Sequence, residues 1–385
     1  MFPYEDSIDP ASVGINPAKL NHVVERFRYQ QSFGAFPGGQ LVVRRNNQVV
    51  LNLTIGLARG FRAIEAKHIE VQQDTPFPVY STGKPLAAIA IALLEERGLI
   101  DVHAPVAKII PEFACHGKNG ITILDVLTHT AGIIEPALYK NYRALTNREH
   151  ILKLIVEAKP VYKRGTLAYM PWEFGVILNE IVLIITQKTL AQFINDEFSV
   201  PLNLPALQFG LAHRPLDSLA YTYWLGKKKV IVANTNVAEN FEEINNSQEL
   251  FDSQNPAFSM VTDAASLAAF YEFLLNDGIA RTGKKLLSAE TIRRYTTLSV
   301  SGWNKSLGTY TAIGRGFMLG TLLPSPYGWW NTKPCFGHAG AFSSLAFGDY
   351  KTGMAIAIVT NGNHGLIDFA KRFMPVTNQL RQACL

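Results

Sequence analysis

The strand-like segments of this chain lie at its two ends, and a long stretch with helical periodicity separates them. Near the N-terminus, residues 40–44 and 49–55 are strand-like and are joined by Arg45-Asn46-Asn47, which has the composition of a tight turn. Near the C-terminus, the strand-like segments are 315–320, 343–348 and 354–359. Strands that gather at both ends, instead of alternating with helices, favour an α+β fold in which one antiparallel sheet joins the two ends of the chain.

Helical patterns flank and separate these strands. Residues 17–32 and 365–383 are amphipathic, and residues 81–97 form an apolar helical pattern that ends before Gly98. The other helical segments, between the two groups of strands, are 121–129, 147–158, 173–198 and 262–277. We therefore expect a discontinuous sheet domain of residues 1–80 plus 285–385, with an inserted, mostly helical domain of residues 81–284.

The composition is that of a folded protein without a nucleic-acid partner or a metal module. Of the 385 residues, 48% are hydrophobic and 17% charged, which excludes a disordered chain. The formal net charge is only +5, and the short run Lys227–Lys229 is more typical of a solvated loop than of a nucleic-acid surface. The 3 cysteines are too few and too far apart for a zinc module or a disulfide framework, and the histidines show no metal-ligand spacing.

The N-terminus lacks the basic and apolar regions of a signal peptide. The most apolar stretch, residues 174–186, is interrupted by Asn179 and Glu180 and is too short to span a bilayer. These features predict a soluble, cytoplasmic protein with no membrane span.

The segment Tyr80-Ser81-Thr82-Gly83-Lys84 has the residue types of a nucleophilic site. Ser81 and Lys84 are three residues apart at the start of a helical pattern, so they are neighbours on one face. A serine hydroxyl needs a base to become a good nucleophile, and a lysine amine can serve if burial lowers its pKa. A helix N-terminus also offers backbone N–H groups to an oxyanion. The alternative is that Ser81 only caps the helix and Lys84 is a solvated residue of its first turn.

Five segments together resemble the serine β-lactamase and penicillin-binding protein superfamily. Ser81-x-x-Lys84, within residues 74–106, resembles the first motif of that superfamily. The other four segments resemble its class C β-lactamase and family VIII carboxylesterase branch, and they follow in the family order: ILDVLTHTAGI (123–133), KRGTLAYMP (163–171), MVTDAASLAAFYEFLLNDG (260–278) and FGHAGAFSSLAFGD (336–349). The resemblance implies a β-lactamase/transpeptidase-like fold, with the active site between the sheet domain and the helical domain. It also implies a serine hydrolase without a cofactor.

The resemblance places Tyr169 at the catalytic tyrosine of the family. A phenol beside a lysine ammonium could ionise and act as a general base. The usual family pattern is Tyr-x-Asn, whereas this chain has Tyr169-Met170-Pro171, so the amide is missing. In β-lactamases that amide is expected to bind the side-chain amide of the substrate. Its absence favours esters or other acyl compounds over antibiotics as substrates.

The third family motif has two candidates. A literal Lys-Thr-Gly occurs at residues 351–353, but it lies between two strand-like segments and is interpreted as a hairpin turn. The better match is His338-Ala339-Gly340, which resembles the His-x-Gly variant of esterase relatives. This match implies that His338 and Gly340 bind substrate, and that the N–H of Ala341 joins the N–H of Ser81 in an oxyanion hole.

Other side chains offer alternatives or additions to this site. Asp125 and His129 could form a triad with Ser81, although the resemblance makes His129 structural. Trp172 is a candidate for an apolar substrate pocket, and so are Trp303, Trp329 and Trp330, unless these residues belong to the core.

The function predicted from the sequence is a carboxylesterase that acts on a small ester or acyl substrate. Its catalytic residues would be Ser81, Lys84 and Tyr169. The alternatives are an acyltransferase that uses a small alcohol, a β-lactamase or D-amino-acid peptidase, and a non-catalytic binding protein of the same fold.

Overall fold

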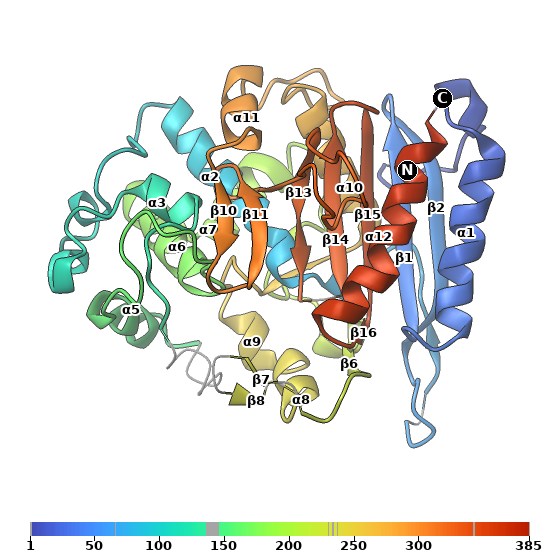
Figure 1. Ribbon diagram of the computed structural model, residues 1–385, viewed down its shortest axis with the longest axis horizontal. Coiled ribbons are helices and arrows are strands. Elements are labelled where there is room, and N and C mark those ends of the chain that lie inside the picture. The colour runs from blue at the N-terminus through green and yellow to red at the C-terminus, as the bar shows by residue number, and fades with distance from the viewer. Residues whose placement is uncertain are drawn as a thin grey trace.

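A nine-stranded antiparallel sheet forms the centre of the described part of the chain (Figure 1). The computed structural model describes residues 2–65, 67–135, 146–229, 231–232, 235–236, 238–341 and 343–384. The order of the strands in the sheet is β10-β11-β12-β13-β14-β15-β1-β2-β3. Their bounds are β1 (Gly38–Arg45), β2 (Gln48–Arg59), β3 (Ile69–Glu70), β10 (Val300–Asn304), β11 (Thr309–Ile313), β12 (Met318–Leu319), β13 (Cys335–Gly340), β14 (Ser344–Asp349) and β15 (Met354–Thr360).

The sheet joins the two ends of the chain through β1. This strand pairs with β2 on one side and with β15 on the other, where Gly39 lies opposite Thr360. The turn between β1 and β2 uses Asn46 and Asn47 at φ 55° and 62°, the left-handed conformation that Asn tolerates and two-residue hairpins favour. The expected hairpin, the shared sheet and the α+β class are therefore confirmed.

Part of the C-terminal sheet differs from the sequence-based prediction. The segment 315–320 contributes only the short strand β12, while the pattern missed β10, β11 and β13. The strands β10 and β11 form the edge hairpin of the sheet, so several of their side chains are exposed and the segments lack a continuous apolar run. The glycines of β13, including Gly337, allow close strand contacts but have low β propensity.

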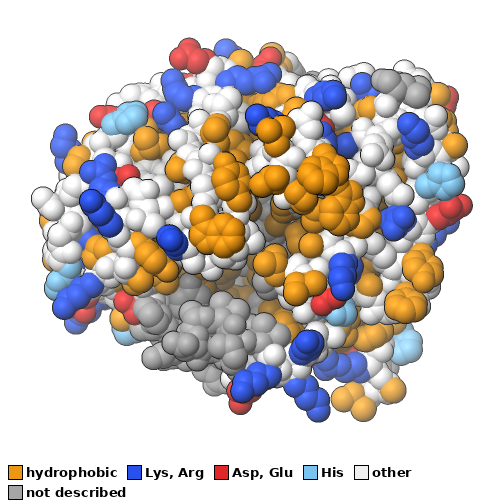
Figure 2. All heavy atoms as spheres, in the orientation of Figure 1, with side chains coloured by type: hydrophobic (Ala, Val, Ile, Leu, Met, Phe, Trp, Pro, Cys, Tyr) orange, Lys and Arg blue, Asp and Glu red, His pale blue; other side chains and the backbone are white. Residues whose placement is uncertain are grey.

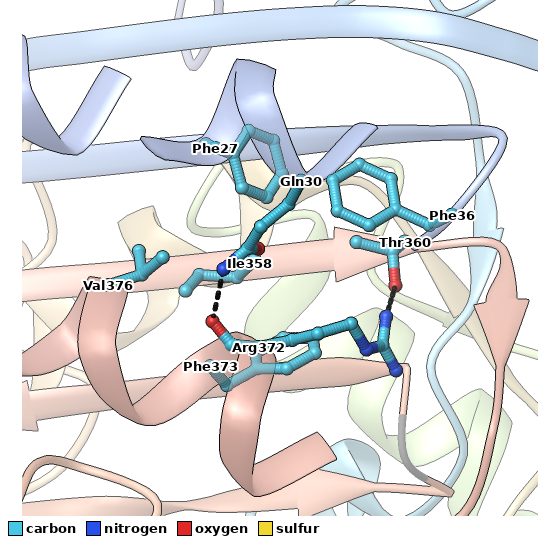
Figure 3. A pocket seen from close by; sticks show the side chains of 8 residues that line it. All are labelled: Phe27, Gln30, Phe36, Ile358, Thr360, Arg372, Phe373 and Val376. Carbon is cyan, nitrogen blue, oxygen red and sulfur yellow. Dashed lines mark hydrogen bonds between the residues drawn. The ribbon is translucent and has the colours of Figure 1, made fainter. Parts of the chain in front are cut away.

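Helices α1 (Pro17–Ser32) and α12 (Leu366–Ala383) cover one face of the sheet (Figure 1). One face of each strand packs against them, as the core formed by Phe27, Val43, Ile358 and Phe373 shows. Figure 3 shows a small hollow within this layer, where Gln30 donates a hydrogen bond to the backbone carbonyl of Arg372. This layer lies on the opposite face of the sheet from Ser81.

The other face of the sheet packs against α10 (Ala264–Leu275), which contacts β1, β14 and β15. Residues of the alternate register, such as Val42, Ala357 and Val359, belong to the core on this side, together with α10 and the apolar helix α2 (Lys84–Glu96). Helix α2 in turn contacts α6 (Glu173–Thr186), α7 (Leu190–Ile194) and α11 (Ala289–Thr296). The division into residues 1–80 plus 285–385 and residues 81–284 stays a proposal.

The remaining elements are short and lie mostly between α2 and α10. The helices are α3 (Ile123–Leu127), α5 (Arg148–Glu157), α8 (Phe241–Asn245) and α9 (Gln248–Asp252). The strands are β4 (Phe77–Pro78), β5 (Gln208–Phe209), β6 (Tyr223–Trp224), β7 (Ile231–Val232), β8 (Thr235–Asn236), β9 (Met260–Thr262) and β16 (Gly362–Asn363). The short 3-10 and π-helical segments are η1 (Pro10–Val13), η2 (Tyr80–Gly83), η3 (Val106–Lys108), η4 (Pro111–Gly117), η6 (Asn195–Ser199) and η7 (Leu216–Ser218).

Two of the expected helices are interrupted. The segment 173–198 divides into α6, α7 and the π-helical turn η6, and α6 ends at Gln187, which has a φ of 60°. The segment 262–277 starts as the end of β9, and Asp263 then caps α10 by accepting a hydrogen bond from the Ser266 N–H. Within the described residues, no single helix is long and apolar enough to cross a membrane. One pair, Glu173–Thr186 and Leu190–Ser199, would be so only as a span bent by 71°.

Candidate active site

The turn η2 places Ser81 immediately before α2. The β4–β9 pairing leads into this turn, since the Val79 N–H donates a hydrogen bond to the Met260 carbonyl. Pro85 lies in the first turn of α2, where backbone N–H groups have no acceptor within the helix, so the N–H that proline lacks costs no helical hydrogen bond. The spacing of three residues then brings the Lys84 Nζ to 3.0 Å from the Ser81 Oγ. The geometry that the sequence predicts for this pair is present.

Lys84 is buried, and two backbone carbonyls accept hydrogen bonds from its Nζ. These are the carbonyl of Pro171 at 2.9 Å and that of Ala257 at 3.0 Å. Burial lowers the pKa of Lys84 to about 7, and the nearby negative charge of Glu173 opposes this shift. A neutral amine has two N–H bonds and one lone pair. When both N–H groups donate hydrogen bonds to the two carbonyls, the lone pair remains free to accept the proton of the Ser81 hydroxyl.

The Ala257 carbonyl is held in place by a short loop that packs against α6. The Asn255 side chain accepts a hydrogen bond from the Ala257 N–H at 2.9 Å. Gly175 of α6 permits this close packing, because an added Cβ would lie 2.2 Å from the Asn255 Oδ1 and 2.6 Å from the Ala257 nitrogen. The carbonyl also lies 3.3 Å from the Ser81 Oγ, so it contacts both members of the pair.

Tyr169 lies against Lys84, whose Nζ is 5.1 Å from the centre of the phenol ring. The Asn304 side chain accepts a hydrogen bond from the Tyr169 N–H at 3.0 Å and so attaches this segment to β10. Burial raises the pKa of the phenol above its ordinary value, although a hydrogen bond with the Ser81 side chain opposes the shift. The phenol therefore keeps its proton at neutral pH, unlike the ionised phenol considered from the sequence.

His129 and Asp125 do not complete a triad with Ser81. The Asp125 carboxylate accepts hydrogen bonds from Thr122 in the capping box of α3 and from Arg164. The Nδ1 of His129 accepts the Met170 N–H at 3.1 Å, and its ring lies 4.7 Å from that of Tyr169. His129 is a buried packing partner of the Tyr169 segment, as the family resemblance implies.

Strand β13 lies against η2 and brings its end next to Ser81. At Gly340 an added Cβ would be 2.0 Å from the Val79 carbonyl oxygen, so only glycine fits between the two segments. The Ser344 Oγ donates to the same carbonyl at 2.8 Å and lies 2.9 Å from the Thr82 Oγ1. These contacts place Ala341, at φ 31°, directly after the point of closest approach.

His338 is buried and uncharged at neutral pH. Its Nδ1 lies 2.6 Å from the Ala339 carbonyl, which can only accept, so Nδ1 carries the proton and Nε2 is the acceptor. Within the described residues, Nε2 is buried without a hydrogen-bond partner. Burial, together with the charge of Lys84, lowers the pKa of His338 to about 3. The ring lies 5.9 Å from that of Tyr169, so the two side chains are neighbours in the site.

The literal Lys351-Thr352-Gly353 is a turn, as predicted. It connects β14 to β15, and the Gly353 N–H closes the turn on the Asp349 carbonyl at 2.8 Å.

The tryptophans differ in their environments. Trp172 precedes α6 and packs on Phe258, with ring centres 4.1 Å apart. In contrast, the side chains of Trp303, Trp329 and Trp330 are 61%, 40% and 68% exposed, so they are not core residues. Figure 2 shows hydrophobic side chains clustered around a hollow near the middle of one face of the molecule.

Sequence reasoning missed two side chains at this site, Glu173 and Asn304. Both are buried, Glu173 at the start of α6 and Asn304 at the end of β10. Glu173 follows Tyr169 by four residues, and a charged residue within the otherwise apolar stretch 172–178 could have indicated it. Asn304 lies in a segment that carried no strand signal, so only the fold reveals it. Within the described residues, no group of three His, Cys, Asp or Glu side chains is arranged to hold a metal ion.

Comparisons with known proteins concern the family and the fold of the chain. The sequence profile of the Beta-lactamase family matches residues 26–379. The chain belongs to the β-lactamase family. Among curated relatives of this family, the Esterase/beta-lactamase LipL of Mycobacterium tuberculosis is 26% identical over 355 residues, which cover 85% of this chain and 77% of LipL. The chain is accordingly a serine hydrolase of the β-lactamase fold.

Solved structures show the same β-lactamase/transpeptidase-like fold over nearly the whole chain. A penicillin-binding protein homolog from Caulobacter crescentus has a TM-score of 0.82 at 23% identity, with 96% of this chain and 99% of that chain covered. A family VIII carboxylesterase has a TM-score of 0.79 at 23% identity, with 97% and 99% covered. At these identities the likeness concerns the fold.

Proposed function

We propose that this member of the β-lactamase family is a carboxylesterase that hydrolyses small esters through an acyl-enzyme on Ser81. The observation that carries the proposal is the contact between the Ser81 Oγ and the Lys84 Nζ at 3.0 Å, with two carbonyls accepting the N–H bonds of the amine. Burial, which lowers the pKa of Lys84 to about 7, supplies a large fraction of neutral amine at physiological pH.

In the first half of the reaction, Ser81 attacks the ester carbonyl while Lys84 takes the hydroxyl proton. The negative charge that forms on the carbonyl oxygen is held by the N–H groups of Ser81 and Ala341. The C–O bond to the alcohol then breaks, and the leaving alkoxide needs a proton. Tyr169 is the donor, because its phenol is protonated and its ring lies beside Lys84, and Lys84 returns the proton to it.

In the second half, water attacks the acyl-enzyme and gives its proton to Lys84. The tetrahedral intermediate collapses, the carboxylic acid leaves, and Ser81 recovers its proton from Lys84. Each residue thus returns to its starting state, and the net reaction is ester plus water to acid plus alcohol.

The charges around Ser81 favour an ester over a β-lactam antibiotic. Pro171 has no side-chain amide, so it contributes only its carbonyl, which Lys84 occupies. At the third motif His338 stands in place of the lysine of the family, and its pKa of about 3 leaves it neutral at physiological pH. The site therefore lacks both the amide and the positive charge with which β-lactam recognition is associated. His338 instead offers its Nε2 as an acceptor to an uncharged substrate hydroxyl or amide.

Trp172 and Phe258 supply an apolar wall for the substrate. Each adjoins one of the two carbonyls that bind Lys84, since Trp172 follows Pro171 and Phe258 follows Ala257. The centres of their rings are 4.1 Å apart, so the two side chains form one continuous apolar surface. An apolar acyl or alcohol group matches this wall better than a charged group does.

The proposal is tested with p-nitrophenyl esters of increasing acyl length beside a chromogenic cephalosporin, with the acyl-enzyme detected by intact mass. We expect turnover of short esters that is lost in Ser81→Ala and retained in Ser218→Ala, a change at an exposed serine of η7. Faster turnover of the cephalosporin than of every ester would contradict the ester assignment. Ester turnover that survives Ser81→Ala would identify another nucleophile.

A further inference from the structure

A single peptide group lies between Lys84 and Glu173. The carbonyl of the Pro171–Trp172 peptide accepts a hydrogen bond from the Lys84 Nζ at 2.9 Å. The N–H of the same peptide donates to the Glu173 Oε2 at 3.2 Å. Because the C=O and N–H of a trans peptide point in opposite directions, Lys84 and Glu173 lie on opposite sides of this group. They are joined in a chain of two hydrogen bonds without touching.

Glu173 is buried, and hydrogen bonds fix its carboxylate in this position. Its side chain is fully buried at the first residue of α6, where the helix dipole favours a negative charge. Its second oxygen, Oε1, accepts the Glu135 N–H at 2.7 Å. The carboxylate therefore fastens the segment after Gly132 to the start of α6, next to Trp172. Both oxygens have backbone donors, which fixes their direction toward the peptide.

We propose that Glu173 is a positioning residue that acts on Lys84 through the Pro171–Trp172 peptide group. The carboxylate accepts a hydrogen bond from the peptide N–H. This bond polarises the peptide group, so its carbonyl becomes a stronger hydrogen-bond acceptor for Lys84. The Pro171 carbonyl then holds one N–H of the amine in a fixed direction. The lone pair of the amine stays aimed at Ser81. The proposal rests on the proposed role of Ser81 as nucleophile.

The titratable groups around these two hydrogen bonds make the protonation of Lys84 sensitive to pH near neutrality. The titratable groups that face Lys84 are Tyr169, His129, His338 and Glu173. Burial keeps the phenol protonated, and burial together with the charge of Lys84 lowers the pKa of both histidines, so these three groups stay uncharged. Burial raises the pKa of Glu173 to about 7, in the same range as that of Lys84. Two coupled groups therefore lose protons over one pH interval.

The experiment measures the rate at which a fluorophosphonate probe labels Ser81 between about pH 5 and pH 10. In this reaction the Ser81 oxygen forms a bond to phosphorus, fluoride leaves, and the hydroxyl proton passes to Lys84. Labelling depends on the nucleophile and its base but not on ester preference. If the protein hydrolyses no ester but the probe still labels Ser81, the proposed substrate class is wrong. The pH profile of labelling then still tests the role of Glu173.

In Glu173→Gln the negative charge is removed, so the ammonium form of Lys84 is less stable and its pKa falls. We expect the midpoint of the acid limb to move to lower pH by about one unit, the size expected for one charge several ångströms away at an effective dielectric constant of about 20. The limb should also become as steep as a single titration, whereas the wild-type limb is broader because two groups titrate.

Glu180→Gln is the matched control, because Glu180 is a buried glutamate of the same helix that pairs with Arg148 instead. We expect Glu180→Gln to lower thermal stability and to leave the pH profile of labelling unchanged. A Glu173→Gln profile that superimposes on that of the wild type, with a similar loss of stability, would show that Glu173 is only structural.

Glu173→Asp keeps the charge and shortens its reach, and it serves if the glutamine variant does not fold. We expect this variant to keep the broad limb and a midpoint near that of the wild type, with slower labelling at all pH values. A narrow limb at lower pH in Glu173→Asp would overturn the proposal, because the charge would then be irrelevant to Lys84.

Discussion

Lys84 and Lys118 are two buried lysines that each follow a nucleophilic side chain by three residues, Ser81 in one case and Cys115 in the other. Each Nζ donates to two backbone carbonyls. For Lys84 these are the carbonyls of Pro171 and Ala257, and for Lys118 they are those of Val156 and Ala158, at 2.7 and 2.6 Å. Burial lowers the pKa of both amines. The two sites have the same spacing and a similar number of acceptors.

They differ in the source of the carbonyls and in what the nucleophile faces. Val156 and Ala158 lie at the C-terminal end of α5, where the helix dipole favours a cation, so Lys118 caps that helix as an ammonium. The Cys115 thiol donates to the Val156 carbonyl at 2.7 Å and is occupied by it. The carbonyls around Lys84 belong to irregular segments. Each lysine also contacts its nucleophile, the Cys115 sulfur at 3.7 Å from Lys118 and the Ser81 hydroxyl at 3.0 Å from Lys84, but only Ser81 lies beside a phenol, that of Tyr169. In the proposed function, the pair of Ser81 and Lys84 is catalytic and that of Cys115 and Lys118 is not, because only the surroundings of Lys84 favour the neutral amine.

The largest effect expected from this comparison is on activity. Lys84→Met keeps the length of the side chain and removes the base, so we expect ester hydrolysis to fall by about a thousandfold or more. Lys118→Met makes the same chemical change at the other site, and we expect its kcat/KM to stay within about threefold of the wild-type value. Steady-state kinetics on p-nitrophenyl acetate measures both. Equal losses in the two variants would mean that burial of a lysine, and not its partner, decides the activity.

The second effect is on stability and runs in the opposite direction. Lys118→Met leaves two carbonyls at the end of α5 without their buried donor, and we expect a loss of about 2 to 5 kcal/mol in the free energy of unfolding. Lys84→Met also leaves two carbonyls without a donor, but it removes an amine whose charged form burial disfavours strongly enough to lower its pKa to about 7, so we expect a smaller loss than in Lys118→Met. Chemical denaturation at neutral pH measures the two values. A larger loss in Lys84→Met than in Lys118→Met would contradict the assignment of Lys118 as the cap.

The pH dependence of stability separates the two variants further. The pKa of Lys84 is about 7 in the folded protein and near 10.5 in the unfolded chain, so the unfolded chain binds more protons between these values. The contribution of Lys84 to the free energy of unfolding therefore rises with pH from about 7 to about 10. We expect the difference in unfolding free energy between the wild type and Lys84→Met to change in that direction. A difference that stays constant over this interval would mean that the pKa of Lys84 is not lowered.

The sequence predicts one of these two lysine sites and not the other, for a physical reason. Ser81 and Lys84 are local partners at the start of an apolar helix, so their contact follows from spacing alone. The same spacing also gives a contact between Cys115 and Lys118, with the Nζ 3.7 Å from the sulfur, although η4 is irregular there, so contact alone does not distinguish the two sites. What distinguishes the sites is the carbonyls, and these come from segments 38 to 173 residues away in the chain.

The prediction of the fold from the sequence was limited in a similar way. Strong periodicity or turn chemistry predicted the hairpin at residues 46–47, the outer helices and the strands β14 and β15, since these elements have one buried face. The edge hairpin of β10 and β11 was missed, and with it Asn304, which anchors Tyr169 through a bond across 135 residues. Glu173 was missed although its charge interrupts the apolar stretch 172–178, because its role depends on the fold, which brings the Pro171–Trp172 peptide between it and Lys84.

The smallest expected effect concerns the nucleophiles themselves. In Cys115→Ser the hydroxyl can donate to the Val156 carbonyl as the thiol does, so we expect a change in unfolding free energy within about 1 kcal/mol and an unchanged kcat/KM. In Ser81→Cys, by contrast, a thiol is placed beside an amine that can take its proton, so we expect rapid alkylation by iodoacetamide at neutral pH. Cys115 should react slowly in the same protein, because its thiol donates a hydrogen bond to the Val156 carbonyl. Mass spectrometry of the alkylated peptides compares the two cysteines directly in Ser81→Cys. If Cys115 reacted as fast as the cysteine introduced by Ser81→Cys, the hydrogen bond to the Val156 carbonyl would not protect its thiol, and the contrast between the two sites would fail.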